Sequence, residues 1–148
     1  MDISNTAEWC LACRIVSGDV SPVGGFVYAD EYWTINHVMP PVHILGYLVL
    51  QPRRHVEAMH QFIPEEAASL GQLLARVDYA LRQAVDAEKV YVCLFAESAE
   101  CPHLHFHLIP RESGMTSIGP DIFGYRAPHP YAEEEVASLV QELKQLLS

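Results

Sequence analysis

Short runs of β-branched, aromatic and aliphatic residues recur along the chain and predict five strands. These strands are expected at residues 24–29, 32–38, 45–50, 90–95 and 103–109. Asp30 and Glu31 suit a tight hairpin turn between the first two strands. The third run is apolar on both faces, which indicates a central strand, and Pro52 follows as its end. The short loop between the last two runs favours an antiparallel pair.

Helical periodicity marks two long segments and one short one. Residues 64–85 are the clearest helix, because Pro64 fits the first helical position and the two glutamates after it lie where the helix dipole favours anions. Its expected buried stripe is Ala67, Leu70, Leu74, Val77, Leu81 and Val85. A second helix over residues 132–147 is expected to bury Val136, Leu139, Val140, Leu143 and Leu147. A short helix is expected over residues 5–16, with Gly18 as its stop.

The order of these elements predicts an α+β fold in a single domain, residues 1–148. The length is about that of one domain, and the sequence shows no internal repeat or linker. Hairpin, strand, long helix, two strands and helix together indicate an antiparallel sheet with helices packed against it. Residues 112–130 are rich in glycine and proline and lack periodicity, so a functional or mobile loop is expected there. In that loop, Phe123 and Tyr125 can cover a base or meet a dimer partner.

Composition narrows the range of partners. Nine Lys and Arg residues stand against 19 Asp and Glu, a formal net charge of −10, so we expect no nucleic-acid partner and no anionic membrane surface. The first residues lack the features of a signal peptide, and no apolar run approaches the ~20 residues of a membrane span. A cytoplasmic protein with reduced thiols is expected. Its cysteines are Cys10, Cys13, Cys93 and Cys101.

The last predicted strand carries the candidate chemistry. Strand side chains alternate faces, so His103, His105 and His107 are expected to line one exposed face. The apolar residues between them are expected to pack into the core. Three aligned imidazoles can bind a metal, relay protons, attack phosphorus or cradle an anion. The structural alternative is that one or two of them satisfy core hydrogen bonds. Surface positions are expected for the other candidates, His37, His43, His60 and His129.

This pattern of histidines resembles the signature of the histidine-triad nucleotide hydrolases and transferases. The trailing Pro110 and Arg111 are more similar to the dinucleoside-polyphosphate-hydrolase side of the family than to the phosphoramidase side. Residues 9–19 resemble the Cys-x-x-Cys opening of bacterial members. Residues 46–55 resemble the family's Gly-His-x-Leu-Val-x-Pro-Lys-x-His stretch. The resemblance implies a five-stranded antiparallel sheet with two main helices, usually paired as a homodimer.

The resemblance also implies a mechanism. His105, the middle histidine, would attack the α-phosphorus of a nucleotide and form a nucleotidyl-histidine intermediate that water hydrolyses. A neutral imidazole is a good nucleophile near pH 7, so the chemistry is sound. His107 would donate to a phosphate oxygen or fix its neighbour's tautomer. Dinucleoside polyphosphates and nucleotide phosphoramidates are the implied substrates. Because the net charge is −10, local positive potential must come from histidines, backbone amides and Arg111.

A structural zinc site is the implied cofactor. Cys10 and Cys13 form half of a tetrahedral zinc site. Zinc-binding members of the family complete it with the residues at His55 and His103, which gives two cysteines, two histidines and no open position. Two alternatives stay open: a redox pair, although the βαβ context of such pairs is missing, and two buried apolar residues of the first helix.

The sequence departs from the family at three places. The loop before the triad, residues 96–102, has no glutamine, and Ser98 is either a phosphate contact or an ordinary turn residue. Tyr47 replaces a histidine that supports proton traffic near the triad. Asn36 is a candidate for the ribose hydrogen bond, or it merely ends a strand.

Two other functions compete with the hydrolase. One is a non-catalytic nucleotide-binding module with an eroded site, which the departures at Tyr47 and in the pre-triad loop favour. The other is a catalytic metal site on the triad face, with zinc or iron and an open position for water. This last hypothesis leaves Cys10 and Cys13 without a role.

Overall fold

The computed structural model describes residues 8–148, and its centre is one five-stranded sheet. The strands are β1 (Phe26–Ala29), β2 (Trp33–His37), β3 (Leu48–Pro52), β4 (Ala87–Leu94) and β5 (Phe106–Glu112). Their order is β1-β2-β3-β5-β4, and every neighbouring pair is antiparallel. The predicted α+β fold with an antiparallel five-stranded sheet is confirmed. So is the central place of β3, whose two faces are both covered.

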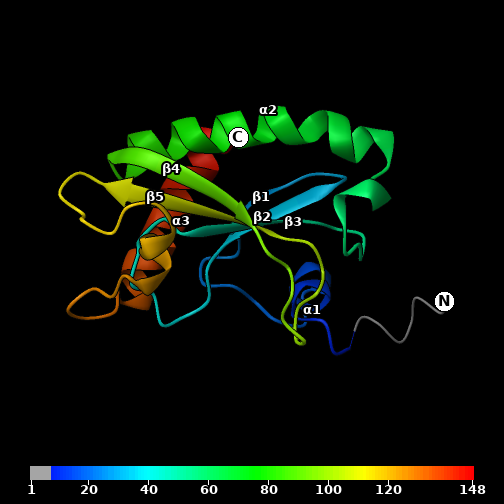
Figure 1. The fold of residues 1–148 in the computed structure, drawn as a ribbon, viewed down its shortest axis with the longest axis horizontal. Helices are drawn as coiled ribbons and strands as arrows, with labels where there is room; N and C mark the ends of the chain where they lie inside the picture. Colours follow the sequence, from blue (N-terminus) through cyan, green and yellow to red (C-terminus); the bar gives the residue numbers. More distant parts are fainter. Residues whose placement is uncertain (1–7) are drawn as a thin grey trace.

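The two faces of the sheet are covered by different helices (Figure 1). They are α1 (Leu11–Ser17), α2 (Pro64–Ala84) and α3 (Glu133–Leu147), with 3-10 turns η2 (Met59–Gln61) and η3 (Gly119–Gly124). The long helices α2 and α3 cover one face and bury the main apolar core, whereas α1 and η3 lie on the other. No helix in the described range combines the length and apolar composition needed to cross a membrane.

The buried residues of α2 and α3 test the apolar stripes predicted for the two long helices. In α3 all five expected residues are buried, so that stripe is confirmed. In α2, Ala67 is exposed and Leu74 only half-buried, whereas Leu73 and Ala80 are buried. The stripe drifts around α2 because 3.6 residues per turn do not keep one series of steps on one face for six turns. Glu66 is also buried, and it binds Arg54 with an Nη2–Oε1 distance of 2.6 Å.

Several predicted boundaries need correction. β4 begins at Ala87 rather than at residue 90, and β3 runs over residues 48–52 rather than 45–50. The largest error concerns the triad strand. β5 begins at Phe106, so His103 and His105 precede it and only His107 lies within it. His103 lies outside the strand, so the alternation of side chains along a strand does not predict which way its side chain points.

The short helix α1 begins later than expected. Residues 5–7 of the predicted helix lie outside the described range, and the helix itself starts at Leu11. Cys10 has an extended backbone (φ −87°, ψ 114°) and caps the helix, because its Sγ accepts from the N–H of Cys13 at 3.5 Å. Gly18 ends the helix as predicted, in the left-handed conformation with φ +92°.

The predicted loop at residues 112–130 is ordered against the sheet face opposite to α2. Its turn η3 buries Ile122 against Ile44 and Ile109. Just beyond the loop, the N–H of Tyr131 donates to the carbonyl of Val42 at 2.8 Å, which holds this segment against the β2–β3 loop, residues 38–47. The β2–β3 loop and η3 together form one side of the functional face.

His37 holds the β2–β3 loop in place from the side of the main core. The expectation of a surface position is wrong, because His37 is fully buried at the end of β2. Its Nδ1 donates to the carbonyl of Val38 at 3.1 Å, and its Nε2 accepts from the N–H of Gly46 at 2.9 Å. Gly46 has φ +92°, and a Cβ there would lie 3.2 Å from Pro110, so glycine is required. Burial lowers the pKa of His37 below its usual value of 6.5.

Replacing His37 by leucine should destabilise the protein most at neutral and alkaline pH. His37→Leu leaves the Gly46 N–H unpaired, which costs about 1–3 kcal/mol of unfolding free energy. In the wild type, protonation of the unfolded state lowers stability as the pH falls below 6.5, because the folded pKa is lower. The difference between the two proteins should therefore narrow between pH 8 and pH 5 in urea titrations. A difference that is independent of pH would show that His37 titrates with its ordinary pKa.

Candidate functional site

His105 and His107 form the centre of the face that lacks the long helices. Their ring centroids are 4.9 Å apart. In the sheet, His107 lies between Val49 of β3 and Cys93 of β4, with Leu108 turned to the core on the other face. The apolar residues that alternate with the histidines are buried as predicted, and they hold this part of the chain rigidly.

His105 and His107 are half-buried, and His103 does not belong to this pair. Its side chain is fully buried, so the prediction of three histidines on one exposed face is wrong for it. The N–H of Leu104 donates to the carbonyl of Val56 at 2.7 Å, and His103 Nε2 donates to the carbonyl of Pro52 at 2.8 Å. These bonds hold the segment before β5 against the end of β3 and direct the imidazole away from His105.

The tautomer of His105 follows from one hydrogen bond. Its Nδ1 lies 2.8 Å from the carbonyl oxygen of His103. A carbonyl oxygen can only accept, so Nδ1 carries a proton, and in the neutral ring Nε2 holds the lone pair. In its neutral form, the imidazole of His105 therefore presents Nε2 as the nitrogen that can act as a nucleophile or a base.

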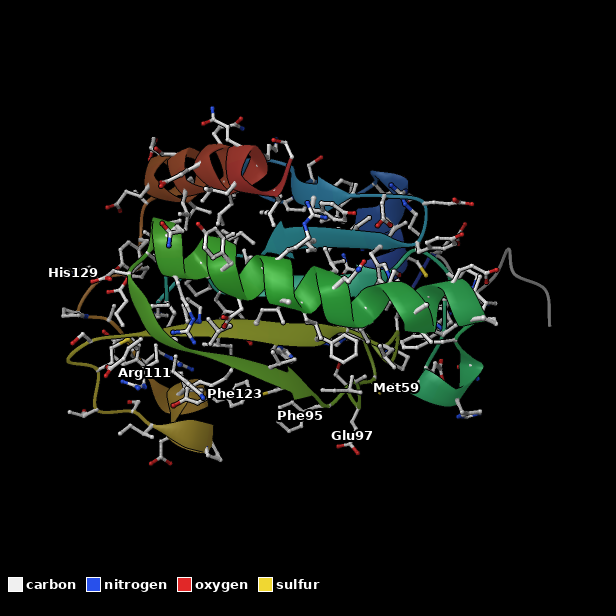
Figure 2. All side chains as sticks on the ribbon, turned by 90° about the horizontal axis from the view of Figure 1, so that it is seen from above. Met59, Phe95, Glu97, Arg111, Phe123 and His129 are labelled. Carbon is white, nitrogen blue, oxygen red and sulfur yellow. The ribbon has the colours of Figure 1, made fainter. Side chains whose placement is uncertain are left out.

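His107 is paired with Tyr47 and surrounded by aromatic rings. The Tyr47 hydroxyl lies 2.6 Å from His107 Nδ1, and the ring centroids of Phe95 and Phe123 lie 6.0 and 5.8 Å from that of the imidazole. Figure 2 labels the two phenylalanines. Burial, and the nearby charge of His105, lower the pKa of His107 to about 4. Burial raises the pKa of Tyr47 to about 12, and Cys93 adds to this. Both groups are therefore neutral at pH 7.

A cavity of about 220 Å³ opens beside the two histidines. Its apolar wall comes from α1, through Leu11, Ala12 and Ile15. Asn36 and Gln51 provide polar atoms at the opposite wall, and the Gln51 amide donates to Asn36 Oδ1 at 2.9 Å. The buried Asn36 also donates to the carbonyl of His37, so its amide orientation is held from both sides. The structure thus brings Asn36 to the same cavity as His105 and His107.

Two other predicted substrate contacts lie elsewhere. Ser98 is exposed, and its Oγ accepts from the N–H of Cys101 at 3.1 Å in a turn. It is not among the residues that line the cavity. Arg111 is four residues beyond His107 on β5, about 13 Å at the usual rise per residue. It pairs with Glu88 at 3.0 Å, and Figure 2 shows it toward the opposite end of β4 from Phe95.

Four side chains gather where α1 meets the segment before β5. The ligand atoms of Cys10, Cys13, His55 and His103 all lie within 4.8 Å of one another. Cys13 Sγ is 3.2 Å from His55 Nδ1 and 3.4 Å from His103 Nδ1. A tetrahedral ion with bonds of about 2.0–2.3 Å separates its ligands by about 3.3–3.8 Å. These four residues can therefore hold a metal ion with little movement.

The second ring nitrogens of the two histidines support a metal in the cluster. His55 Nε2 lies 3.1 Å from a carboxylate oxygen of Glu57, and His103 Nε2 donates to the Pro52 carbonyl. Metal-binding histidines commonly direct their other nitrogen to such acceptors, which leaves the facing nitrogen free to coordinate. Without a cation, burial and the bond to Cys10 raise the pKa of the Cys13 thiol to about 12. A metal ion would reverse this preference by favouring the thiolate.

Some site residues were not found from the sequence. Gln51 shares the face of Val49 on β3, so strand alternation contained the signal. Tyr47 appeared only as a departure from a pattern, and nothing in the sequence showed that its hydroxyl reaches a residue 60 positions away. The wall formed by α1 depends on tertiary packing, which no local pattern reveals.

Comparisons with known proteins agree with this geometry. The family model of the HIT domain matches residues 24–114. The chain is 24% identical over 138 residues to an adenosine 5′-monophosphoramidase of Schizosaccharomyces pombe, covering 90% of this chain and 95% of that protein.

Solved structures share the fold. A histidine triad nucleotide-binding protein of Sulfolobus tokodaii, described as hypothetical, has a TM-score of 0.72 at 22% identity, covering 93% of this chain and 91% of the other. A Zn-bound histidine triad family protein of Mycobacterium smegmatis has a TM-score of 0.68 at 24% identity, covering 93% and 94%.

Proposed function

Because the chain belongs to the HIT domain family, we propose that it is a nucleotide hydrolase or transferase that attacks an α-phosphorus through His105. The observation that carries this proposal is the bond from His105 Nδ1 to the His103 carbonyl, which leaves Nε2 unprotonated beside a cavity. The similarity to a phosphoramidase supports the same reaction class. Dinucleoside polyphosphates and nucleotide phosphoramidates are the proposed substrates.

The proposed reaction has two displacements. The lone pair on His105 Nε2 forms a bond to the α-phosphorus, while the bond from phosphorus to the leaving group breaks and that group keeps the electron pair. A water molecule then attacks the phosphorus, loses a proton to solvent and releases Nε2 of His105. The nucleoside is proposed to occupy the 220 Å³ cavity, with Asn36 at the ribose.

His107 and Tyr47 are proposed to serve the phosphate. With the Tyr47 hydroxyl donating to Nδ1, a neutral His107 carries its proton on Nε2 and can donate to a phosphate oxygen. Tyr47 is thus a positioning residue that sets the tautomer of His107. This assignment gives Tyr47 a role in place of the histidine that the family pattern has there, and it argues against an eroded, non-catalytic site.

A catalytic metal on the triad face is not supported. The imidazole of His103 is directed at Cys13, 3.4 Å away, and donates its other nitrogen to Pro52. It is therefore not available to a metal shared with His105 and His107. For the cluster of two cysteines and two histidines we infer a structural zinc ion, because soft thiolates with imidazoles in a closed tetrahedral set favour zinc. Reduced thiols of this kind fit a cytoplasmic location.

We also propose a homodimer through the edge strand β4. Its residues Val92, Leu94 and the adjoining Phe95 are 48%, 36% and 57% exposed, which is unusual for a free sheet edge. Pairing with a second β4 would cover them. Sedimentation should give twice the chain mass, and Val92→Arg should shift the protein to the monomer. A wild type that sediments as a monomer at micromolar concentration would contradict the dimer.

Brief mixing with adenosine 5′-phosphoramidate or diadenosine tetraphosphate should produce an adenylyl adduct in the intact mass spectrum, if the quench avoids acid. His105→Asn should lack the adduct and lose at least about 1,000-fold in turnover, because the nucleophile is absent. Tyr47→Phe should form the adduct more slowly, and the pH profile of that step should change because the His107 tautomer is no longer set.

Two results would contradict these assignments. An adduct on His105→Asn would show a different nucleophile. Tight nucleotide binding without adduct or product in the wild type would favour the non-catalytic binding module.

Purified wild type should contain about one zinc ion per chain, and Cys13→Ser should contain almost none. Cys93→Ser is the matched control, because Cys93 is on β4 and outside the cluster, and it should keep the metal. Chelation should lower the melting temperature of the wild type, since bound metal stabilises the folded state. Equal metal content in Cys13→Ser and Cys93→Ser would contradict the site.

A further inference from the structure

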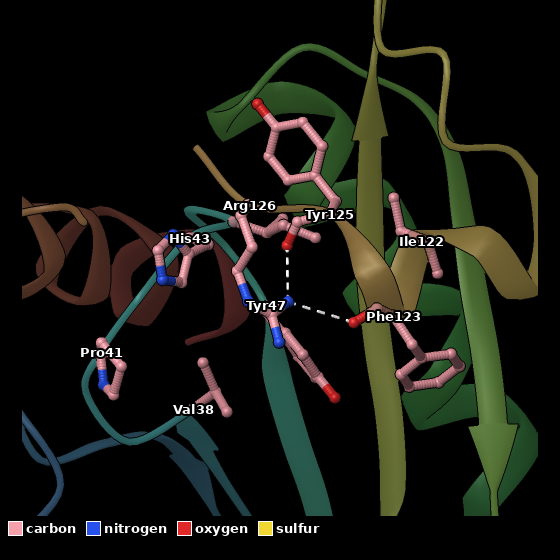
Figure 3. A pocket seen from close by; sticks show the side chains of 9 residues that line it. Val38, Pro41, His43, Tyr47, Ile122, Phe123, Tyr125 and Arg126 are labelled. Carbon is pink, nitrogen blue, oxygen red and sulfur yellow. Dashed lines mark hydrogen bonds between the residues drawn. The ribbon is translucent and has the colours of Figure 1, made fainter. Parts of the chain in front are cut away.

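A second cavity is lined by Tyr47, whose hydroxyl contacts His107 (Figure 3). Its volume is about 240 Å³. The β2–β3 loop forms one wall, with His43. The loop that contains η3 forms the other wall, with Phe123, Tyr125 and Arg126. The proposed mechanism gives these residues no role.

The two cavities are neighbours. Val38 lines both of them. Tyr47 lines this cavity and His107 lines the other, and the two side chains are in contact at 2.6 Å. The ring of Phe123 lies 5.8 Å from His107. A group that leaves the phosphorus at His107 is therefore next to the second cavity.

The sizes of the cavities fit a substrate in two halves. Sites for whole ligands usually measure about 300–1,000 Å³. Each cavity here is smaller, at about 220 and 240 Å³, and the two together reach that range. A nucleotide half in one cavity and a leaving half in the other would place the scissile bond between them, at the His105 and His107 pair.

Arg126 determines the charge that the second cavity prefers. Its Nη1 donates to the backbone carbonyls of Phe123 at 3.2 Å and Tyr125 at 2.7 Å, which holds the guanidinium at the cavity wall. Within residues 8–148, no carboxylate forms an ion pair with Arg126. Arg126 is exposed, and its remaining N–H groups donate to no protein atom in that range, so they are open to solvent and to a ligand. In a chain of net charge −10, such a cation is a specific attraction for an anion.

Polar and aromatic neighbours add to this preference. His43 lines the cavity, and its buried Nδ1 has no hydrogen-bond partner among the described residues. A buried nitrogen of this kind favours a ligand that can satisfy it. Phe123 and Tyr125 offer ring surface to a flat group.

We propose that this second cavity binds the leaving half of the substrate and that this half is phosphorylated, as in a dinucleoside polyphosphate. The proposal rests on the proposed function and names its leaving group. When His105 Nε2 bonds to the α-phosphorus, the bridging P–O bond breaks and its electron pair stays on the oxygen of the departing phosphate. That phosphate leaves as an anion without needing a proton, and Arg126 stabilises its charge. An amine leaving group needs a proton and gains nothing from Arg126.

The test compares two substrates that share the adenylyl half. Arg126→Gln should lower kcat/KM for diadenosine tetraphosphate about 10- to 100-fold, the usual effect of losing a charge-assisted hydrogen bond to the reacting charge. The loss for adenosine 5′-phosphoramidate should be at least tenfold smaller. The matched control is Arg82→Gln, which removes an equal charge from α2 on the opposite face and should affect neither substrate.

A binding measurement separates this inference from the proposed function. Inorganic tripolyphosphate should bind wild type and His105→Asn equally by calorimetry, and at least tenfold more weakly to Arg126→Gln. If the wild type cleaves neither substrate, the proposed function fails, and the tripolyphosphate result alone supports or overturns the anion site. Equal losses of kcat/KM for both substrates, or tripolyphosphate binding that does not depend on Arg126, would overturn the inference.

Discussion

The peptide unit and side chain of His103 hold the functional face together. Its carbonyl accepts a hydrogen bond from His105 Nδ1, its Nε2 donates to the carbonyl of Pro52 at the end of β3, and its Nδ1 faces Cys13. One buried residue thus connects the proposed nucleophile to the sheet and to the candidate metal cluster of Cys10, Cys13, His55 and His103. Because a carbonyl cannot donate, the geometry permits only one tautomer of a neutral His105.

One face of the sheet carries the apolar core, and the opposite face carries the proposed functional groups. On the side of α2 and α3, the side chains form a continuous apolar core. The buried His37 binds Val38 and Gly46 through its two ring nitrogens, and the buried Glu66 binds Arg54 through Oε1. On the other side, polar groups and two small cavities lie over the same strands. A strand that is packed against a core on one face holds its opposite side chains still, which is what a preorganised site requires.

Much of this arrangement was predictable because it depends on local periodicity. The stripe of α3 was correct at every position, since Val136 to Leu147 keeps helical spacing over few turns. The four cluster residues were correctly grouped through a family resemblance rather than through spacing alone. The start of β5 was wrong, because alternating histidines satisfy a strand pattern whether or not a neighbouring strand is there to pair with them. His37 was placed at the surface for a similar reason: its burial depends on a hydrogen bond to Gly46, nine residues away.

By itself, the sequence determined the approximate elements, the class of fold and most of the side chains proposed to carry the chemistry, because these follow from residue type and short-range spacing. Its motifs also resemble those of the family. Only the tertiary structure decided how those side chains are used. It turned His103 toward the cysteines, brought Tyr47 onto His107, placed Arg111 beside Glu88, and left Arg126 without an acidic partner within residues 8–148. Each of these outcomes depends on contacts between segments distant in the chain, where the geometry of a single hydrogen bond sets the protonation and direction of a side chain.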